Sequence, residues 1–120
     1  MSDKPIAERL QVRNGRMLAI MGAPPDVDRS IGTVRAKPAQ ADVLLAFAKN
    51  NAELNKRIPQ LLGAPATAIL WLAYPKLTSS LAGNLNREAV RKCAAAQGLD
   101  TVSQIAIDED WSAMRLKRVA

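Results

Sequence analysis

Three short apolar runs, each followed by residues that interrupt a strand, set the expected architecture of this chain. They span Met17 to Met21, Asp42 to Ala48 and Thr67 to Tyr74. None of them alternates between polar and apolar positions, so we expect strands that are buried on both faces, as in a parallel sheet. Proline follows the first and third runs, and it stops ladder pairing because it has no amide hydrogen.

Apolar residues at helical spacing predict a helix after the second run. Its expected inner face comprises Leu54, Ile58, Leu61 and Leu62. Asn51 is the expected N-terminal cap, and Gly63-Ala64-Pro65 is the expected end. Pro59 is expected to kink this helix or to begin a new turn.

One more helix is expected before this one in the sequence and another after it. A short helix is expected over Asp26 to Ile31, with Asp26 or Asp28 as its cap. A longer helix begins after Asn84 or Asn86 and reaches Gln97, where Gly98 provides a stop. Strands that alternate with helices indicate right-handed crossovers and helices on both faces of the sheet.

The remaining segments complete a doubly wound α/β domain. Residues 1–16 are expected to form a flexible arm or a short helix, and residues 17–120 a single domain. Thr33 to Ala36 is a further strand candidate. Val102 to Ile107 and Ser112 to Lys117 are expected to pair as a C-terminal antiparallel hairpin, because an acidic turn separates them.

Composition narrows the class of protein without adding an element. The chain has 120 residues, 48% of them apolar and 23% charged, as in ordinary soluble domains. No apolar run approaches the ~20 residues that span a bilayer, and no signal-peptide pattern is present. Cys93 is the single cysteine, which excludes an intrachain disulfide. We therefore expect a cytoplasmic protein without a membrane segment.

The net charge of +6 raises the question of nucleic-acid binding. The basic residues form no block, and only four aromatic side chains are available as stacking platforms: Phe47, Trp71, Tyr74 and Trp111. The pattern disfavours nucleic acid as a partner and leaves the oligomeric state open.

Several short motifs resemble a small bacterial family of unknown function. They are Trp71 with Tyr74-Pro75-Lys76, Asn86-Arg87, Gly98-Leu99, and Asp110-Trp111-Ser112-Ala113 with Arg115. The likeness covers most of the chain from Met17 onward. It implies no activity, because the family has none assigned.

The chain also resembles the second half of the Rossmann-like methyltransferase fold, in which strands and helices lead into a closing hairpin. That likeness implies a single-domain three-layer Rossmann-like sandwich with a mostly parallel sheet. The candidate strands would then lie side by side in this order: Thr33 to Ala36, Met17 to Met21, Asp42 to Ala48, Thr67 to Tyr74, Ser112 to Lys117, and Val102 to Ile107. Methyltransferases of this fold share a glycine-rich loop after the first strand, where this chain has Gly22-Ala23-Pro24-Pro25. The prolines remove amide donors, which disfavours S-adenosylmethionine.

Candidate binding residues gather where parallel strands end, because ligands of open α/β sheets collect at that edge. They are Lys76, Thr78, Ser79, Ser80, Arg87, Trp111 and Arg115. The cations and hydroxyls in this set fit a small phosphate or carboxylate. The alternative interpretation is a solvated loop that merely ends a buried strand.

No catalytic residue, metal site or cofactor is predicted. Histidine is absent, which removes the commonest general base and metal ligand. Cys93 falls on an apolar helix face, as a small core residue does. The leading hypothesis is therefore a domain that binds a small anionic ligand or a protein partner, and it leans away from an enzyme. The alternatives are a reduced methyltransferase-like transferase and salt-dependent nucleic-acid binding.

Overall fold

The computed structural model describes residues 5–12, 15–32, 35–80, 82–83 and 85–119. Its strands are β1 (Leu18–Met21), β2 (Val43–Phe47), β3 (Ile69–Pro75), β4 (Leu99–Ala106) and β5 (Trp111–Arg118). Its helices are α1 (Ile6–Arg9), α2 (Pro25–Ile31), α3 (Asn51–Leu61) and α4 (Arg87–Ala96), with a short 3-10 turn, η1, at Pro38–Gln40.

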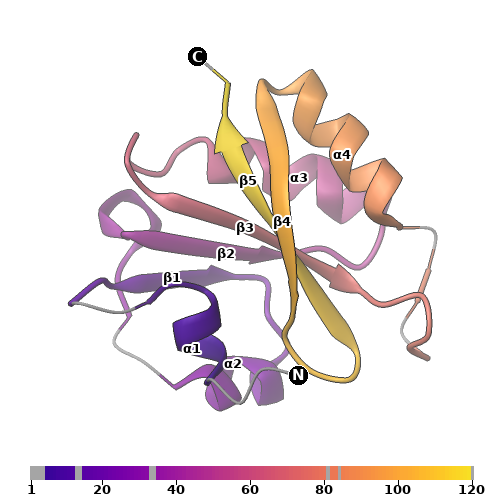
Figure 1. The fold of residues 1–120 in the computed structure, drawn as a ribbon, viewed down its shortest axis with the longest axis horizontal. Helices are drawn as coiled ribbons and strands as arrows, with labels where there is room; N and C mark the ends of the chain where they lie inside the picture. The colour runs from indigo at the N-terminus through magenta and orange to yellow at the C-terminus, as the bar shows by residue number, and fades with distance from the viewer. Residues whose placement is uncertain (1–4, 13–14, 33–34, 81, 84, 120) are drawn as a thin grey trace.

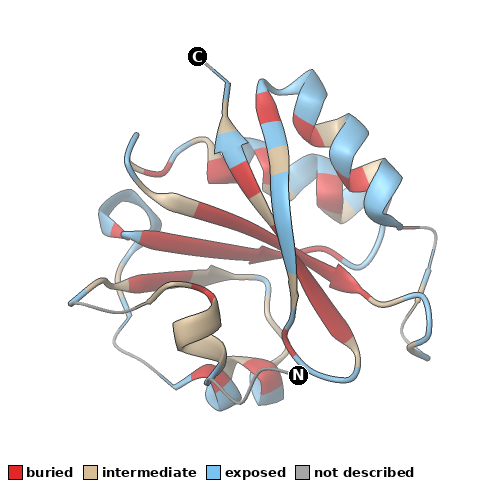
Figure 2. Ribbon diagram, viewed as in Figure 1, coloured by how far each residue is buried: buried red, intermediate tan, exposed pale blue. Residues whose placement is uncertain are grey.

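The described strands form one mixed sheet in the order β1-β2-β3-β5-β4 (Figure 1). β1, β2 and β3 run parallel, and β5 pairs antiparallel with both β3 and β4. The three apolar runs of the sequence are therefore adjacent parallel strands, as expected. β2 is buried along its whole length, which explains why its sequence does not alternate (Figure 2).

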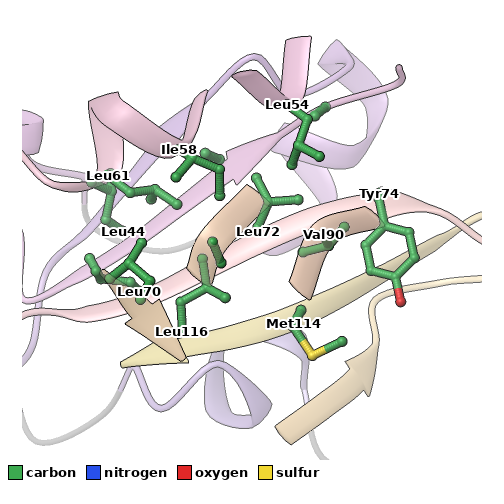
Figure 3. Packing of buried hydrophobic residues seen from close by; sticks show 14 of the residues in the cluster. Leu44, Leu54, Ile58, Leu61, Leu70, Leu72, Tyr74, Val90, Met114 and Leu116 are labelled. Atoms are coloured by element: carbon green, nitrogen blue, oxygen red, sulfur yellow. The ribbon is translucent and has the colours of Figure 1, made fainter. Parts of the chain in front are cut away.

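Helices cover both faces of the sheet, so the molecule has three layers. On one face α3 and α4 pack against the sheet, and Figure 3 shows Leu54, Ile58 and Leu61 of α3 turned toward strand leucines. On the other face Val27 and Ile31 of α2 join a second apolar cluster. The expected α/β class and the Rossmann-like layering are confirmed at this level.

The candidate strand at Thr33 to Ala36 is not an extended strand in the part of the chain that is described. Arg35 forms a single parallel bridge with Leu18, on the side of β1 away from β2. Positions 33 and 34 lie outside the described residues. The described part of this candidate is thus a single bridge at the expected edge of the sheet, and the other candidates stand in the expected order.

The helix caps agree with the sequence-based expectation at α4 and differ from it at α3 and α2. Asn86 caps α4 by accepting a hydrogen bond from the Ala89 amide, as expected. Asn50, and not Asn51, caps α3 by accepting from the Glu53 amide at 2.9 Å. α2 starts at Pro25 without a side-chain cap, so neither of its aspartates caps it, because the fixed proline backbone already suits a first helical turn.

One tryptophan and one arginine side chain join the sheet to segments that are distant in the sequence. The Trp71 Nε1 in β3 donates to the Leu10 carbonyl at 3.0 Å, which docks the segment after α1 on the sheet. Arg118 at the end of β5 donates to the carbonyls of Leu62, Ala64 and Pro65, which follow α3. Both contacts satisfy carbonyls that lie in non-repetitive backbone.

We expect Trp71→Phe to destabilise the protein by about 2–4 kcal/mol, because it removes buried volume and leaves the Leu10 carbonyl without its donor. Urea unfolding measures this loss. Amide exchange at Leu10, whose N–H donates to the Ile6 carbonyl, should also accelerate. Val102→Ala, at a side chain that is 55% exposed, is the control and should change stability by less than about 0.5 kcal/mol. Unchanged exchange at Leu10 would contradict this docking role.

Candidate anion-binding site

Two adjoining hollows lie on the α3–α4 side of the sheet, between the start of α4 and strands β3, β5 and β4. One has a volume of about 430 Å³ and is lined by Tyr74, Lys76, Leu77, Thr78, Arg87, Gln104 and Ser112. The other has a volume of about 420 Å³ and is lined by Arg87, Glu88, Arg91, Thr101, Val102, Ser103, Gln104 and Met114. They share Arg87 and Gln104, so we treat them as one feature, the Arg87 groove.

Strand register brings the floor of the groove together. Tyr74 of β3 stands opposite Ser112 of β5, and Gln104 of β4 stands opposite Met114 of β5. Paired residues point to the same face of a sheet, and Tyr74 and Met114 both belong to the core cluster beneath α3 and α4. Figure 3 shows Tyr74 at the end of that cluster, beyond Met114. The groove therefore begins where the apolar core ends.

A hydrogen-bonded group of three side chains forms the centre of the groove. The Gln104 Oε1 accepts from the Tyr74 hydroxyl at 3.1 Å and from the Arg87 Nε at 3.0 Å. An arginine nitrogen can only donate, so the acceptor end of the Gln104 amide must face it. The amide NH₂ of Gln104 then points away from Arg87 and donates to none of the described residues. The centre thus presents N–H donors.

Charge in the groove is predominantly positive. Its lining carries Lys76, Arg87 and Arg91 against one carboxylate, Glu88. Glu88 forms an ion pair with Arg91, and this contact lowers the pKa of the Glu88 carboxyl. Within the described part of the chain, neither Lys76 nor Arg87 has a carboxylate at ion-pair distance, so the charges of both remain available to a ligand.

The structure brings together only part of the set of residues expected from sequence. Lys76, Thr78 and Arg87 line the same hollow. The Ser79 hydroxyl instead donates to the Asp110 Oδ1 at 2.7 Å. Ser79 and Ser80 are not among the residues that line the groove.

Trp111 and Arg115 lie on the opposite face of the sheet from the Arg87 groove. Trp111 is 2% exposed, and its ring meets Phe47 edge to face at a centroid distance of 4.9 Å. It anchors the hairpin in the core and has no surface to offer a ligand. Arg115 lines a separate hollow with Ile69 and Lys117.

Sequence reasoning missed Gln104, the residue that links the two hollows. Gln104 lies within the expected strand Val102 to Ile107, but the face it occupies depends on a register shift between Thr101 and Ser103. Such a bulge inserts Val102 as an extra residue and reverses the alternation beyond it. The order of residue types does not reveal that insertion.

A second feature at the strand ends lies between β1 and β2. Gly22, which follows β1, has a φ of +75°, and a Cβ built there would lie 2.4 Å from the Arg57 Nη2. Arg57 comes from α3, and its Nε donates to the carbonyl of Phe47, the last residue of β2, at 3.0 Å. The guanidinium of Arg57 therefore lies across the ends of both strands.

No group of three or more acidic or cysteine side chains that could hold a metal ion occurs among the described residues. In the same residues, no helix is both long enough and apolar enough to cross a bilayer.

Comparison with known proteins supports the fold. No protein-family model matches the chain, and no curated sequence is significantly similar to it. Among solved structures, LepI in complex with SAM is similar with a TM-score of 0.56 and 9% identity, over 94% of this chain and 39% of LepI. The B. subtilis tRNA methyltransferase TrmK gives 0.57 and 10%, over 98% of this chain and 67% of TrmK.

The mitomycin 7-O-methyltransferase MmcR is similar with a TM-score of 0.58 and 9% identity, over 95% of this chain and 54% of MmcR. This chain thus spans between 39% and 67% of the length of these three proteins. Such likeness at low identity shows the fold alone. It supports the expected resemblance to the methyltransferase fold, whereas no family model supports the resemblance to a family of unknown function.

The neighbours make S-adenosylmethionine the cofactor to test against this chain, and the residues after β1 do not fit it. Pro24 and Pro25 begin α2 directly after the loop and offer no amide hydrogens. The space beside Gly22, where the cofactor approaches the backbone in that fold, holds the guanidinium of Arg57.

Tyr74, the single tyrosine of the chain, reports directly on the groove. Burial raises its pKa above the ordinary value of 10.0, while the hydrogen bond and charge of Arg87 act in the opposite direction. We expect the tyrosinate absorbance of the folded protein to titrate at higher pH than that of the urea-unfolded chain. Arg87→Gln should raise the pKa of Tyr74 further, and an equal or lower pKa would contradict the contact.

The same shift sets a pH dependence of stability. The unfolded chain loses the tyrosine proton at a lower pH than the folded protein. The stabilising contribution of Tyr74 to the free energy of unfolding is therefore complete below pH 10 and decreases as the pH rises above 10. Tyr74→Phe should remove this component. Urea unfolding of both proteins below and above that pH measures the difference.

Proposed function

We propose that this protein is a binding domain whose Arg87 groove accepts a small anionic ligand, such as a phosphate ester or a carboxylate. The observation that carries the proposal is the fixed orientation of Gln104. Because its oxygen accepts from both Tyr74 and Arg87, the part of the Gln104 amide left for a ligand is its NH₂ donor, beside the remaining N–H donors of Arg87. A donor-lined hollow with unpaired cations favours a negatively charged group.

The surrounding residues support the same class of ligand. Lys76 and the Thr78 hydroxyl stand at one end of the groove, and Arg91 stands at the other. The exposed Leu77 beside Lys76 adds an apolar contact for the rest of the ligand. Burial raises the pKa of the Tyr74 phenol, so this side chain is not suited to act as a general base at neutral pH.

A methyltransferase-like transferase is the second candidate, and it is favoured by the fold shared with LepI, TrmK and MmcR. The loop after β1 argues against it, as described above. This candidate therefore depends on binding of S-adenosylmethionine.

The proposed ligand site is tested by titrating the full chain with phosphate esters and dicarboxylates in calorimetry. We expect Arg87→Gln to weaken binding by about tenfold or more, because it removes a charge-assisted contact and releases Gln104. Lys76→Ala should have a smaller effect in the same direction. Arg29→Gln is a matched control, because it removes the same charge from a side chain that is 74% exposed on α2. Equal affinities for wild type and Arg87→Gln would overturn the proposal.

Calorimetry with S-adenosylmethionine separates the second candidate. We expect no saturable heat from the wild-type protein, because the Arg57 guanidinium occupies the space beside Gly22. Saturable binding, accompanied by methyl transfer to any acceptor, would instead favour the transferase.

A further inference from the structure

The point where the sheet reverses its winding lies between β1 and β2. From β1 the chain passes to Arg35 on one side of this strand and then returns to β2 on its other side. In an open α/β sheet, the crevice outside the strand ends at such a reversal is the place where ligands bind. In this chain the guanidinium of Arg57 lies at these strand ends, beside Gly22 and the Phe47 carbonyl.

Arg57 is held there by neutral acceptors. Its Nε donates to the Phe47 carbonyl at 3.0 Å, and its Nη1 donates to the Gln60 Oε1 at 3.1 Å. In the part of the chain that is described, Nη2 donates to no residue, and no carboxylate lies within ion-pair distance of the guanidinium. Three of the five N–H groups of a guanidinium therefore remain unused here.

Burial makes the missing counter-charge significant. Arg57 is half-buried, and a cation that is partly removed from water without an opposite charge loses solvation that neutral carbonyls do not fully restore. An oxyanion restores it most effectively, because a guanidinium binds carboxylate and phosphate with two parallel N–H bonds.

Gly22 permits this arrangement. A side chain at this position would begin 2.4 Å from the Arg57 Nη2, and the backbone φ of +75° already favours glycine. The missing side chain therefore leaves the guanidinium room at the strand ends.

We propose that Arg57 forms a second anion site at the β1–β2 strand ends, and that it binds a carboxylate or a phosphate group. The site shares no residue with the Arg87 groove, so it goes beyond the proposed function and stands or fails separately.

The test uses NMR of the ¹⁵N-labelled full chain, titrated separately with sodium phosphate and sodium acetate at constant ionic strength held with chloride. We expect saturable shifts of the Arg57 Nε–Hε resonance and of the Gly22 amide. A response to phosphate alone, to acetate alone or to both supports the site and identifies the group it prefers.

Variants decide whether the guanidinium is responsible. Arg57→Gln should weaken the response of the Gly22 amide at least about tenfold, whereas Arg29→Gln should leave it unchanged. Gly22→Ala keeps the charge but displaces the guanidinium, so it should also weaken the response if Arg57→Gln proves too unstable to study. Thermal unfolding of each variant checks that it is folded.

Two results would overturn the proposal. One is an absence of saturable shifts at Gly22 and Arg57 with either anion, and the other is an equal response of Gly22 in wild type and Arg57→Gln. Shifts confined to residues of the Arg87 groove would support the proposed function while removing this second site. Shifts that persist at Gly22 in Arg87→Gln would support the second site independently of the groove.

Discussion

The change from parallel to antiparallel pairing at β3 determines where the residues of the Arg87 groove lie. β3 has a parallel neighbour, β2, on one side and an antiparallel neighbour, β5, on the other. Pro75 at the end of β3 therefore stands opposite Trp111 at the start of β5, and the next amide, of Lys76, donates to the Asp110 carbonyl at 2.8 Å. This hydrogen bond fixes the exit of β3 against the hairpin.

The same pairing brings β4 into reach of α4. Since β5 lies between β3 and β4, Gln104 of β4 stands on the same face as Tyr74 of β3, one strand away. Arg87 enters from the first turn of α4 and completes the group. Three elements that are distant in sequence thus supply one donor-lined groove, while the ends of β1 and β2 carry the separate guanidinium of Arg57.

Sequence pattern predicted the layers of this fold better than the chemistry of its surface. Long apolar runs identify buried strands because a strand between two helical layers has no polar face, and asparagine identified the start of α4 because its side chain satisfies a free amide. Sequence pattern alone groups Trp111 and Arg115 with Lys76 as side chains that could line one pocket, yet the pleat of β5 directs them to the other face. A bulge at Val102 and the packing of Arg57 on Gly22 are three-dimensional facts without a local sequence signature.

The position of β5 has a consequence for biosynthesis. β5 comes last among the described strands, yet it lies in the interior of the sheet, and its Arg118 supplies donors to the carbonyls that follow α3. A nascent chain on the ribosome can assemble β1, β2 and β3 in turn, but the exposed side of β3 has no partner until β5 leaves the exit tunnel. During that interval β3 presents an unpaired apolar edge, which is the kind of surface that chaperones recognise and that neighbouring nascent chains can join.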